Sequence, residues 1–325
     1  MIMKKVLLTL ACVFGMSTAA SALTSSAVLL QHNGNITTYA AEDIGSAMAA
    51  AADGDEVFLN EGKYPGFTIS KAIKIKGAGQ TTVIDGSITI DNSGDASIGD
   101  IFIGFMKINN HIIGKSSANK LDLLQCSFSY FQQEGGVIDE VFVDRCETSC
   151  LYLDATYEET VTIRDVTTTT THPRTKKFTA INSRIVFRQQ VSKYSAYPPY
   201  TIINCYANFS HSYGITVINS ITSYANLLYY SELINCSYNS SVGTGSKLTG
   251  CYQDSNSGST MADWSVYKLE DAGYFGNDDT VIGQLGGTRN TPFTLVPVVP
   301  RVTESSLKVD PQKKELNVTV TVTPK

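Results

Sequence analysis

The chain has 325 residues, of which 42% are apolar and 17% charged, a composition typical of a folded protein rather than a disordered one. Its formal net charge of −5 argues against a general nucleic-acid binder, which needs a basic face. A single Trp stands beside 17 Tyr, and Ser, Thr, Asn and Gly are frequent. These residues suit strands and turns better than helices, so we expect an all-β protein.

The start of the chain is typical of a secretory signal peptide. Lys4 and Lys5 precede an apolar stretch at residues 6–16, and Ala20-Ser21-Ala22 forms a small-residue cleavage site. We therefore expect export to the periplasm, the cell surface or the medium of a bacterium. A lipoprotein anchored through Cys12 is the alternative, although the preceding residues fit a lipobox poorly. No later apolar run approaches the ~18 residues of a membrane helix, so no membrane-spanning segment is expected.

An alanine-rich segment at residues 40–52 predicts a helix near the start of the mature protein. Glu42 and Asp43 lie in its first turn, where acidic side chains interact favourably with the helix dipole, and Gly54 follows its end. Because the open end of a stack of strands needs covering against edge pairing, we interpret this helix as an N-terminal cap.

A strand-rich segment follows the helix. Residues 53–64 read DGDEVFLNEGKY, residues 67–79 contain two pairs of alternating apolar residues before a Gly-Ala-Gly turn, and residues 82–86 read TVIDG. Short alternating runs that are separated by Gly and Asp predict short strands joined by turns.

A repeat of short strands then runs from residue 101 to residue 251. Each unit has two apolar residues two positions apart, then a polar residue, then a small or apolar residue that we call the anchor. Successive anchors are 15–22 residues apart. The anchors are Met106, Cys126, Cys146, Val166, Ser183, Cys205, Ser220, Cys236 and Cys251.

The residue before the anchor repeats as well. It is Asn182, Asn204, Asn219 or Asn235 in four units and Asp165 in a fifth. Both residue types tolerate the left-handed backbone conformation that a sharp bend requires. Units this short leave no room for a helical crossover, so parallel pairing must come from coiling of the chain.

These features predict a right-handed parallel β-helix, a solenoid in which anchors and bend residues of successive coils stack about 4.8 Å apart. The alternative is a β-sandwich with strands at intervals of about 8–12 residues. A sandwich explains neither the Asn before the anchor nor the stacking of the anchors.

The segment at residues 53–86, together with the Asn ladder, resembles the first coils and the ladder of bacterial pectin-lyase-like right-handed β-helix proteins. The resemblance covers roughly residues 36–285. It implies the fold, but it does not imply one activity, because this superfamily includes lyases, hydrolases, esterases, phage spikes and proteins of unknown role.

Six cysteines follow the signal peptide, an even number that in an exported protein usually indicates disulfides. Five of them are anchors, so we expect a ladder of free, buried thiols that act as small apolar fillers. Disulfides between adjacent anchors, such as Cys126–Cys146 or Cys236–Cys251, are the alternative. Cys150 lies off the register and has no predicted place.

The repeat fades after Cys251. Residues 279–287 are similar to a final coil, and three prolines between residues 292 and 300 indicate a linker. Apolar residues then alternate at 307–309 and 316–322, which predicts a terminal hairpin that folds back over the last coil. A detachable anchoring or sorting tail is the alternative.

The predicted organisation is therefore an all-β chain in three parts. Residues 1–22 form the signal peptide, and residues 23–290 form the parallel β-helix domain with its N-terminal capping helix. Residues 291–325 form the proline-containing linker and the β-hairpin tail.

Charge is segregated between neighbouring coils. Residues 139–165 contain eight acidic residues and two arginines, whereas residues 166–193 contain six basic residues and no acid. One interpretation is a lyase site for uronate polymers. Such a site needs a cation to neutralise the substrate carboxylate and a base to remove the adjacent proton, and carboxylate oxygens suit Ca²⁺, the one cofactor that the sequence suggests.

On that interpretation Asp144, Glu147 and Asp165 are the candidate Ca²⁺ ligands. Arg184 and Lys176 are the candidate catalytic bases, because a basic residue beside a metal can have a depressed pKa. A simpler interpretation is an ion pair. Asp144 and Arg164 occupy the same position on consecutive coils, where a surface pair would contribute about 0–1 kcal/mol.

Tyrosines indicate a second candidate site, because exposed aromatic rings can stack on sugar faces. The long coil at residues 184–204 carries Tyr194 and Tyr197 together with Arg188 and Lys193, and we take these four as candidate substrate-binding residues. Further tyrosines follow at positions 206, 213, 224, 229 and 230.

The sequence leaves three hypotheses for function. The first is an exported β-helix that binds, or is displayed on, a polysaccharide or cell-surface glycan. It is favoured because neither a polygalacturonase-type order of paired carboxylates nor a G-x-S-x-G elbow occurs. The second is a Ca²⁺-dependent polysaccharide lyase that acts on uronates by β-elimination. The third is a structural or adhesive surface protein.

Overall fold

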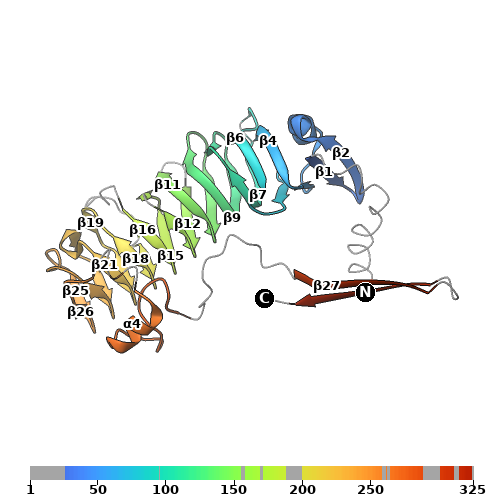
Figure 1. The fold of residues 1–325 in the computed structure, drawn as a ribbon. Helices are drawn as coiled ribbons and strands as arrows, with labels where there is room; N and C mark the ends of the chain where they lie inside the picture. The colour runs from blue at the N-terminus through green and yellow to red at the C-terminus, as the bar shows by residue number, and fades with distance from the viewer. Residues whose placement is uncertain are drawn as a thin grey trace. The chain divides into compact units, whose positions relative to one another are not determined.

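The computed structural model describes residues 26–94, 96–154, 158–168, 171–187, 200–257, 261, 264–287, 301–310 and 315–323. Contacts divide the chain into two compact units, Met1–Leu295 and Val296–Lys325. The first unit contains a parallel β-solenoid of about eight turns (Figure 1), which confirms the predicted all-β, parallel β-helix fold. The predicted signal peptide lies outside the described residues. In the part of the chain that is described, no helix is long and apolar enough to cross a membrane.

A hairpin and a short helical segment cover the N-terminal end of the solenoid. β1 (Ala27–His32) pairs antiparallel with β2 (Asn35–Ala40) and with β3 (Glu56–Leu59). The predicted helix is confirmed as η1 (Ala41–Asp43) followed by α2 (Ile44–Ala50), which packs against the first turn.

The β1–β2 hairpin was not anticipated by the sequence analysis. Its two-residue turn is Asn33-Gly34, with φ of 48° and 82°. An Asn-Gly pair between short alternating runs is the strongest local signal for such a hairpin, because both turn residues need positive φ. The signal was therefore present in the sequence, and the cap consists of a hairpin as well as a helix.

From β3 onward, strands pair in parallel with strands of neighbouring turns. In chain order the further strands of the first unit are β4 (Gly62–Ile69), β5 (Lys74–Gly77), β6 (Thr82–Ile90), β7 (Ile98–Ile108), β8 (His111–Gly114), β9 (Ala118–Gln133), β10 (Ile138–Asp144), β11 (Glu147–Asp154), β12 (Glu158–Arg164), β13 (Thr167–Thr168), β14 (Thr171–Arg174), β15 (Lys177–Ile181), β16 (Arg184–Val186), β17 (Thr201–Ile203), β18 (Tyr206–Asn208), β19 (Ser212–Tyr213), β20 (Thr216–Ile218), β21 (Ile221–Ser223), β22 (Leu228–Tyr229), β23 (Glu232–Ile234), β24 (Ser237–Tyr238), β25 (Lys247–Thr249) and β26 (Tyr252–Gln253). A short helix, η2 (Ala225–Leu227), lies between β21 and β22.

The core is a column of stacked apolar side chains. Ile163, Ala180, Ile202, Val217 and Leu233 follow one another at the same register position on successive turns, and all five are fully buried. Because alternate residues of a strand point to opposite faces, this register keeps each column inside the coil. Each turn therefore covers the interior of the turn before it.

The predicted bend residues all adopt the left-handed conformation, with φ between 48° and 52° at Asp165, Asn182, Asn204, Asn219 and Asn235. Phe105, Gln125 and Arg145 hold the same position in earlier turns, with φ of 61°, 50° and 51°. The bend is therefore imposed by the coil at every turn, and residues with no preference for it accept it where stacking requires.

The anchors form a ladder of buried side chains beside these bends. The N–H of Cys126 donates to Sγ of Cys146 over 3.4 Å, and the N–H of Cys205 donates to Oγ of Ser220 over 3.0 Å. Sulfur and hydroxyl groups of the next turn thus satisfy main-chain donors that the bend directs inward. All six cysteines that follow the predicted signal peptide are free, so the predicted thiol ladder is confirmed and the alternative disulfides are not formed.

Replacing a bend Asn by valine tests the left-handed bend. For Asn235→Val we expect the free energy of unfolding to fall by about 1–2 kcal/mol, because a β-branched residue is strained at this φ. Asn235→Gly is the matched control, and it should change stability by less than about 1 kcal/mol, since glycine adopts positive φ freely. Urea unfolding followed by circular dichroism measures both, and equal effects would contradict a backbone origin.

The predicted final coil at residues 279–287 is wrong. β26 is the last strand of the parallel ladder in the described part, and the chain then turns back through α4 (Val266–Asp271). The N–H of Gly283 donates to the carbonyl of Asn219 over 2.8 Å, and the N–H of Ile282 donates to that of Tyr274 over 3.1 Å. This glycine-rich segment therefore runs along the bends of earlier turns instead of extending the solenoid.

The second unit is a β-hairpin, which confirms the predicted secondary structure of the tail. β27 (Arg301–Asp310) pairs antiparallel with β28 (Glu315–Thr323), and the pairing shifts register once, between Val302 and Glu304. Its predicted place over the last coil stays a prediction, as does the alternative of a detachable tail.

Candidate functional site

The charged junction contains a buried ion pair. Asp144 ends β10 and accepts two hydrogen bonds from Arg164, from Nε at 3.1 Å and from Nη2 at 2.5 Å. Nη2 of Arg145 lies 3.6 Å from the same carboxylate. The hydrogen bonds that Arg164 donates to Asp144 raise the pKa of Arg164. The ion-pair interpretation is thus confirmed, but Asp144 is only 2% exposed, so the pair is not the surface contact that the sequence predicted.

This donor set does not fit a Ca²⁺ site. Both carboxylate oxygens of Asp144 face guanidinium groups, while Glu147 is exposed at the start of β11 and Asp165 lies at a bend one turn further on. Among the described residues, no three His, Cys, Asp or Glu side chains are grouped so that they could hold a metal ion. We therefore derive no catalytic step through calcium.

The two candidate bases lie at opposite ends of one strand. Lys176 is exposed just before β15, and Arg184 begins β16 after the following bend. The five residues of β15, at about 3.3 Å each, separate the two ends by about 16 Å. The Arg184 guanidinium lies over the ring of Tyr206, 5.2 Å from its centroid. The structure therefore does not bring these two residues together.

The predicted substrate-binding residues Tyr194, Tyr197, Arg188 and Lys193 lie outside the described residues. The tyrosines that follow them are described, and three of them lie on one surface. That surface lies near the C-terminal end of the solenoid, where β19 and β22 of successive turns pair in parallel.

On this surface four rings lie in two parallel layers. Tyr213 and Tyr229 are in register, with centroids 4.9 Å apart and planes 20° apart. Tyr230 also lies nearly parallel to Tyr213, at 6.5 Å and 21°, and His211 lies nearly parallel to Tyr229, at 6.1 Å and 14°. We call His211, Tyr213, Tyr229 and Tyr230 the aromatic strip.

Two glycines of the next turn hold the strip in place. A Cβ on Gly243 would come within 3.0 Å of Cδ1 of Tyr229, and a Cβ on Gly245 would come within 2.5 Å of Cδ1 of Tyr230. The backbone of this turn can therefore approach the rings closely, which restricts them before any ligand arrives. Tyr230 is nevertheless 58% exposed. The strip is thus an ordered aromatic surface that is open to solvent.

The spacing of the strip was readable in the sequence. Tyr213 and Tyr229 are 16 residues apart, the same interval that separates the anchors Ser220 and Cys236. In a solenoid, residues that share the anchor interval stack, so these two tyrosines could have been paired in advance. The place of His211 in the strip could not be predicted in this way, because the residue at the equivalent position of the next turn is not aromatic.

A second aromatic group lies in earlier turns, on β8, β9 and β11. The rings of His111 and Tyr130 stack with centroids 3.4 Å apart, and Tyr152 meets Tyr130 edge-on at 6.4 Å. Burial lowers the pKa of His111. Tyr152 is 45% exposed, but its ring does not share the orientation of the other two.

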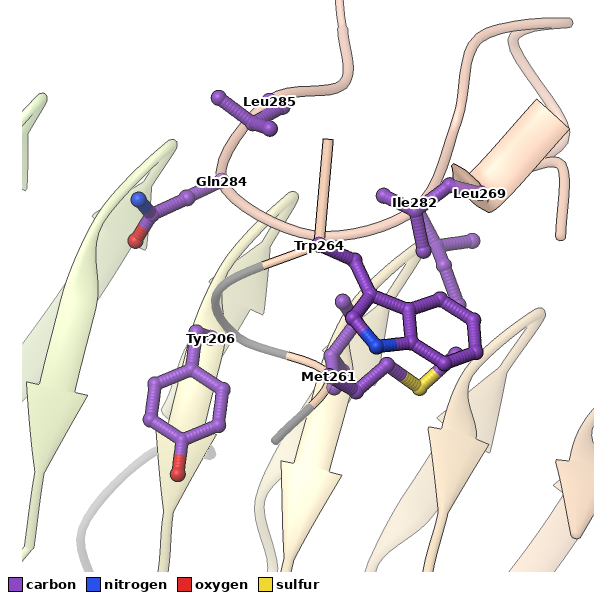
Figure 2. A pocket seen from close by; sticks show the side chains of 8 residues that line it. Tyr206, Met261, Trp264, Leu269, Ile282, Gln284 and Leu285 are labelled. Carbon is purple, nitrogen blue, oxygen red and sulfur yellow. The ribbon is translucent and has the colours of Figure 1, made fainter. Parts of the chain in front are cut away.

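The segment after β26, which includes α4, packs on the outer face of the solenoid. Figure 2 shows the side chains at this contact, where the segment after β26 meets β18 and β21. They enclose a cavity of about 10 Å³, the lower limit for one water molecule. The contact is therefore a packing interface and not a ligand-sized pocket. The lining residues are Tyr206, Ile221, Met261, Trp264, Leu269, Ile282, Gln284 and Leu285.

Comparisons with protein-family models, with curated proteins and with solved structures find no match. The assignment of the fold therefore rests on the structure itself, which supports a parallel β-helix. Membership of the pectin-lyase-like superfamily stays a prediction from the sequence.

Proposed function

We propose that this protein is an exported β-helix of the pectin-lyase-like type that binds a polysaccharide or cell-surface glycan. The aromatic strip is the observation that carries the proposal. It is an ordered group of solvent-open rings on the side of an elongated scaffold, and a repeating scaffold of this kind suits an extended chain ligand.

The physical basis is the match between aromatic rings and sugars. A sugar ring presents C–H groups on its faces and hydroxyls around its rim, so it packs against an aromatic side chain and bonds to polar neighbours. Polar side chains also occur on the turn of Tyr229 and on the next turn: Asn226 and Ser240 lie beside one another, with Oγ of Ser240 3.3 Å from Oδ1 of Asn226. Because the rings are already held by stacking and by the glycines, binding costs little side-chain entropy.

Removing a ring of the strip is expected to weaken glycan binding. For Tyr229→Ala we expect a loss of about tenfold in affinity, which corresponds to 1.4 kcal/mol, close to the value of one aromatic contact. Tyr229→Phe should retain most of the binding, since the ring remains. Binding is measured by affinity electrophoresis in gels that contain soluble polysaccharides.

Tyr267→Ala provides the matched control, because Tyr267 is 77% exposed and lies on α4, outside the strip. Its removal should leave binding unchanged. Thermal unfolding of each variant checks that loss of affinity does not reflect loss of fold. Equal affinities of Tyr229→Ala and the unmodified protein, in a gel that retards the unmodified protein, would contradict the role of the strip.

The lyase hypothesis is tested in the same preparations. β-Elimination creates an unsaturated sugar that absorbs near 235 nm, so absorbance is followed while the protein meets uronate polysaccharides with Ca²⁺ and with chelator. Glycan binding without a rise in absorbance supports the binding protein that we propose. A Ca²⁺-dependent rise that is lost in Arg184→Ala would establish the lyase instead, and a protein that neither binds nor cleaves would leave the structural or adhesive role.

A further inference from the structure

We infer that the glycan bound by the aromatic strip is a neutral polysaccharide and not a uronate. This inference rests on the proposed function and specifies the ligand of the same site. It is drawn from the distribution of charge along the solenoid, which is independent of the stacking of the rings.

The turns that carry the strip are almost free of charge. Residues 200–253 contain one acidic residue, Glu232, and one basic residue, Lys247, besides His211. Glu232 and Lys247 are both exposed and face one another at the same register position of β23 and β25. Their opposite charges are adjacent, so the Asp, Glu, Lys and Arg side chains of residues 200–253 add up to no net charge.

The exposed polar groups around the strip are hydroxyls and amides. Ser210 and Ser240 are partly exposed, and Asn226, Ser241 and Thr244 are exposed. Such groups both donate and accept hydrogen bonds, which matches the hydroxyls of a neutral sugar. They provide no cation for a carboxylate.

A uronate would meet two physical obstacles at this surface. The face of an aromatic ring is the negative region of its quadrupole, which attracts C–H groups and disfavours an anion. A carboxylate that loses water without gaining a cationic partner also pays a large desolvation cost. A neutral sugar meets neither obstacle, because its C–H faces lie on the rings and its hydroxyls exchange water for protein partners.

Most charged residues of the solenoid lie in earlier turns, where several described cations have partners. Lys120 pairs with Asp122 at 3.0 Å, Arg164 pairs with Asp144 at 2.5 Å, and Arg184 lies over Tyr206. The charge segregation noted in the sequence therefore separates an ion-paired region from a neutral aromatic region. Among the described residues, it brings no Lys or Arg into residues 200–246, which carry the strip.

The test compares neutral and acidic polymers at two salt concentrations. Without added calcium, the mature protein is mixed with insoluble cellulose, chitin, starch and mannan, and with alginate and polygalacturonate coupled to agarose beads, at about 0.02 M and about 0.5 M NaCl. Between these concentrations the Debye length falls from about 20 Å to about 4 Å, so attraction between charges is largely screened. We expect binding to at least one neutral polymer that changes less than about twofold with salt and that falls about tenfold in Tyr229→Ala, while Tyr229→Phe retains it.

Two results would overturn the inference, and they are distinguishable. Binding only to alginate or polygalacturonate, weakened by salt and by Arg184→Ala but not by Tyr229→Ala, would leave a glycan-binding protein whose ligand is acidic. Binding to none of the polymers would overturn the proposed function, and the inference with it.

Discussion

Replacing Arg164 by alanine is expected to lower the free energy of unfolding by about 3–5 kcal/mol, the cost of leaving one member of a buried ion pair without its partner. In Arg164→Ala the carboxylate of Asp144, which is 2% exposed in the native protein, loses both hydrogen bonds from Arg164 and keeps the Arg145 contact at 3.6 Å. The variant also loses the packing of the Arg164 guanidinium on Phe142, whose ring centroid lies 5.0 Å away. Equilibrium unfolding in urea measures the effect.

The opposite deletion should cost less, and this asymmetry makes the prediction specific. In Asp144→Asn the side chain that loses its partner is Arg164, which is 28% exposed and can turn its charge toward water. The double variant Asp144→Leu/Arg164→Met should recover much of the loss, because apolar residues of similar volume often replace a buried pair at little cost. A loss of 1 kcal/mol or less in Arg164→Ala would instead show an ordinary surface pair.

The ion pair shows how far sequence reasoning reached in the charged junction. The shared register position of Asp144 and Arg164 was enough to predict that they meet. Their burial was not, because it depends on what covers the end of β10: the guanidinium of Arg145 and the long side chain of Arg164, which rests on Phe142. The same packing removes Asp144 from any metal site, so the candidate Ca²⁺ ligands could not be judged from charge pattern alone.

The fold was predictable where one residue type recurs at a position that requires it. Asn before the anchor meets that condition, and the four predicted Asn bends lie within a few degrees of one another in φ. The bends at Phe105, Gln125 and Arg145 do not meet that condition, because these residue types have no preference for the left-handed conformation. Stacking on neighbouring turns imposes it on them. Solenoid stacking is a long-range property, so a sequence pattern reveals it only where local preference agrees with it.

The prediction of a final coil at residues 279–287 failed for a related reason. Residues 279–287 have the glycines and the aliphatic residue of a coil, but a coil needs a strand in register with its predecessor, and Gly283 bonds instead to the bend residue Asn219. The last complete stacking position is that of Cys251.

Cys251 is expected to react with iodoacetamide about 100-fold or more faster than Cys236 at pH 7, because a buried thiol reacts only when the structure around it opens. Cys236 is fully buried under the next turn, whereas in the described part no turn follows Cys251. The same loss of cover is seen at Leu248, which is 41% exposed where its counterpart Leu233 is buried. Peptide mapping by mass spectrometry measures each rate in one sample.

The labelling of the two partly exposed thiols should change over different pH ranges. Hydrogen bonding from the side chain of Cys236, helped by backbone donors, lowers the pKa of Cys251 to about 6. Burial raises the pKa of Cys150 to about 11. Because the thiolate is the reactive form, labelling of Cys251 should be nearly constant from pH 7 to 9 and should fall about tenfold per pH unit below pH 5. Labelling of Cys150 should instead rise about tenfold per pH unit from pH 7 to 10.

These two profiles separate the effect of exposure from the effect of the ladder. Cys150 lies outside the ladder, so its high pKa reflects burial without a donor to the sulfur, whereas Cys251 accepts the N–H of Cys236 at 3.4 Å. In Cys236→Ala the thiolate of Cys251 loses its side-chain donor, and its plateau should shift to higher pH while its labelling stays faster than that of Cys126 or Cys146. An unchanged profile in Cys236→Ala would show that the side chain of Cys236 does not lower the pKa of Cys251. Equal labelling of Cys251 and Cys126 would show that the end of the ladder is covered in solution.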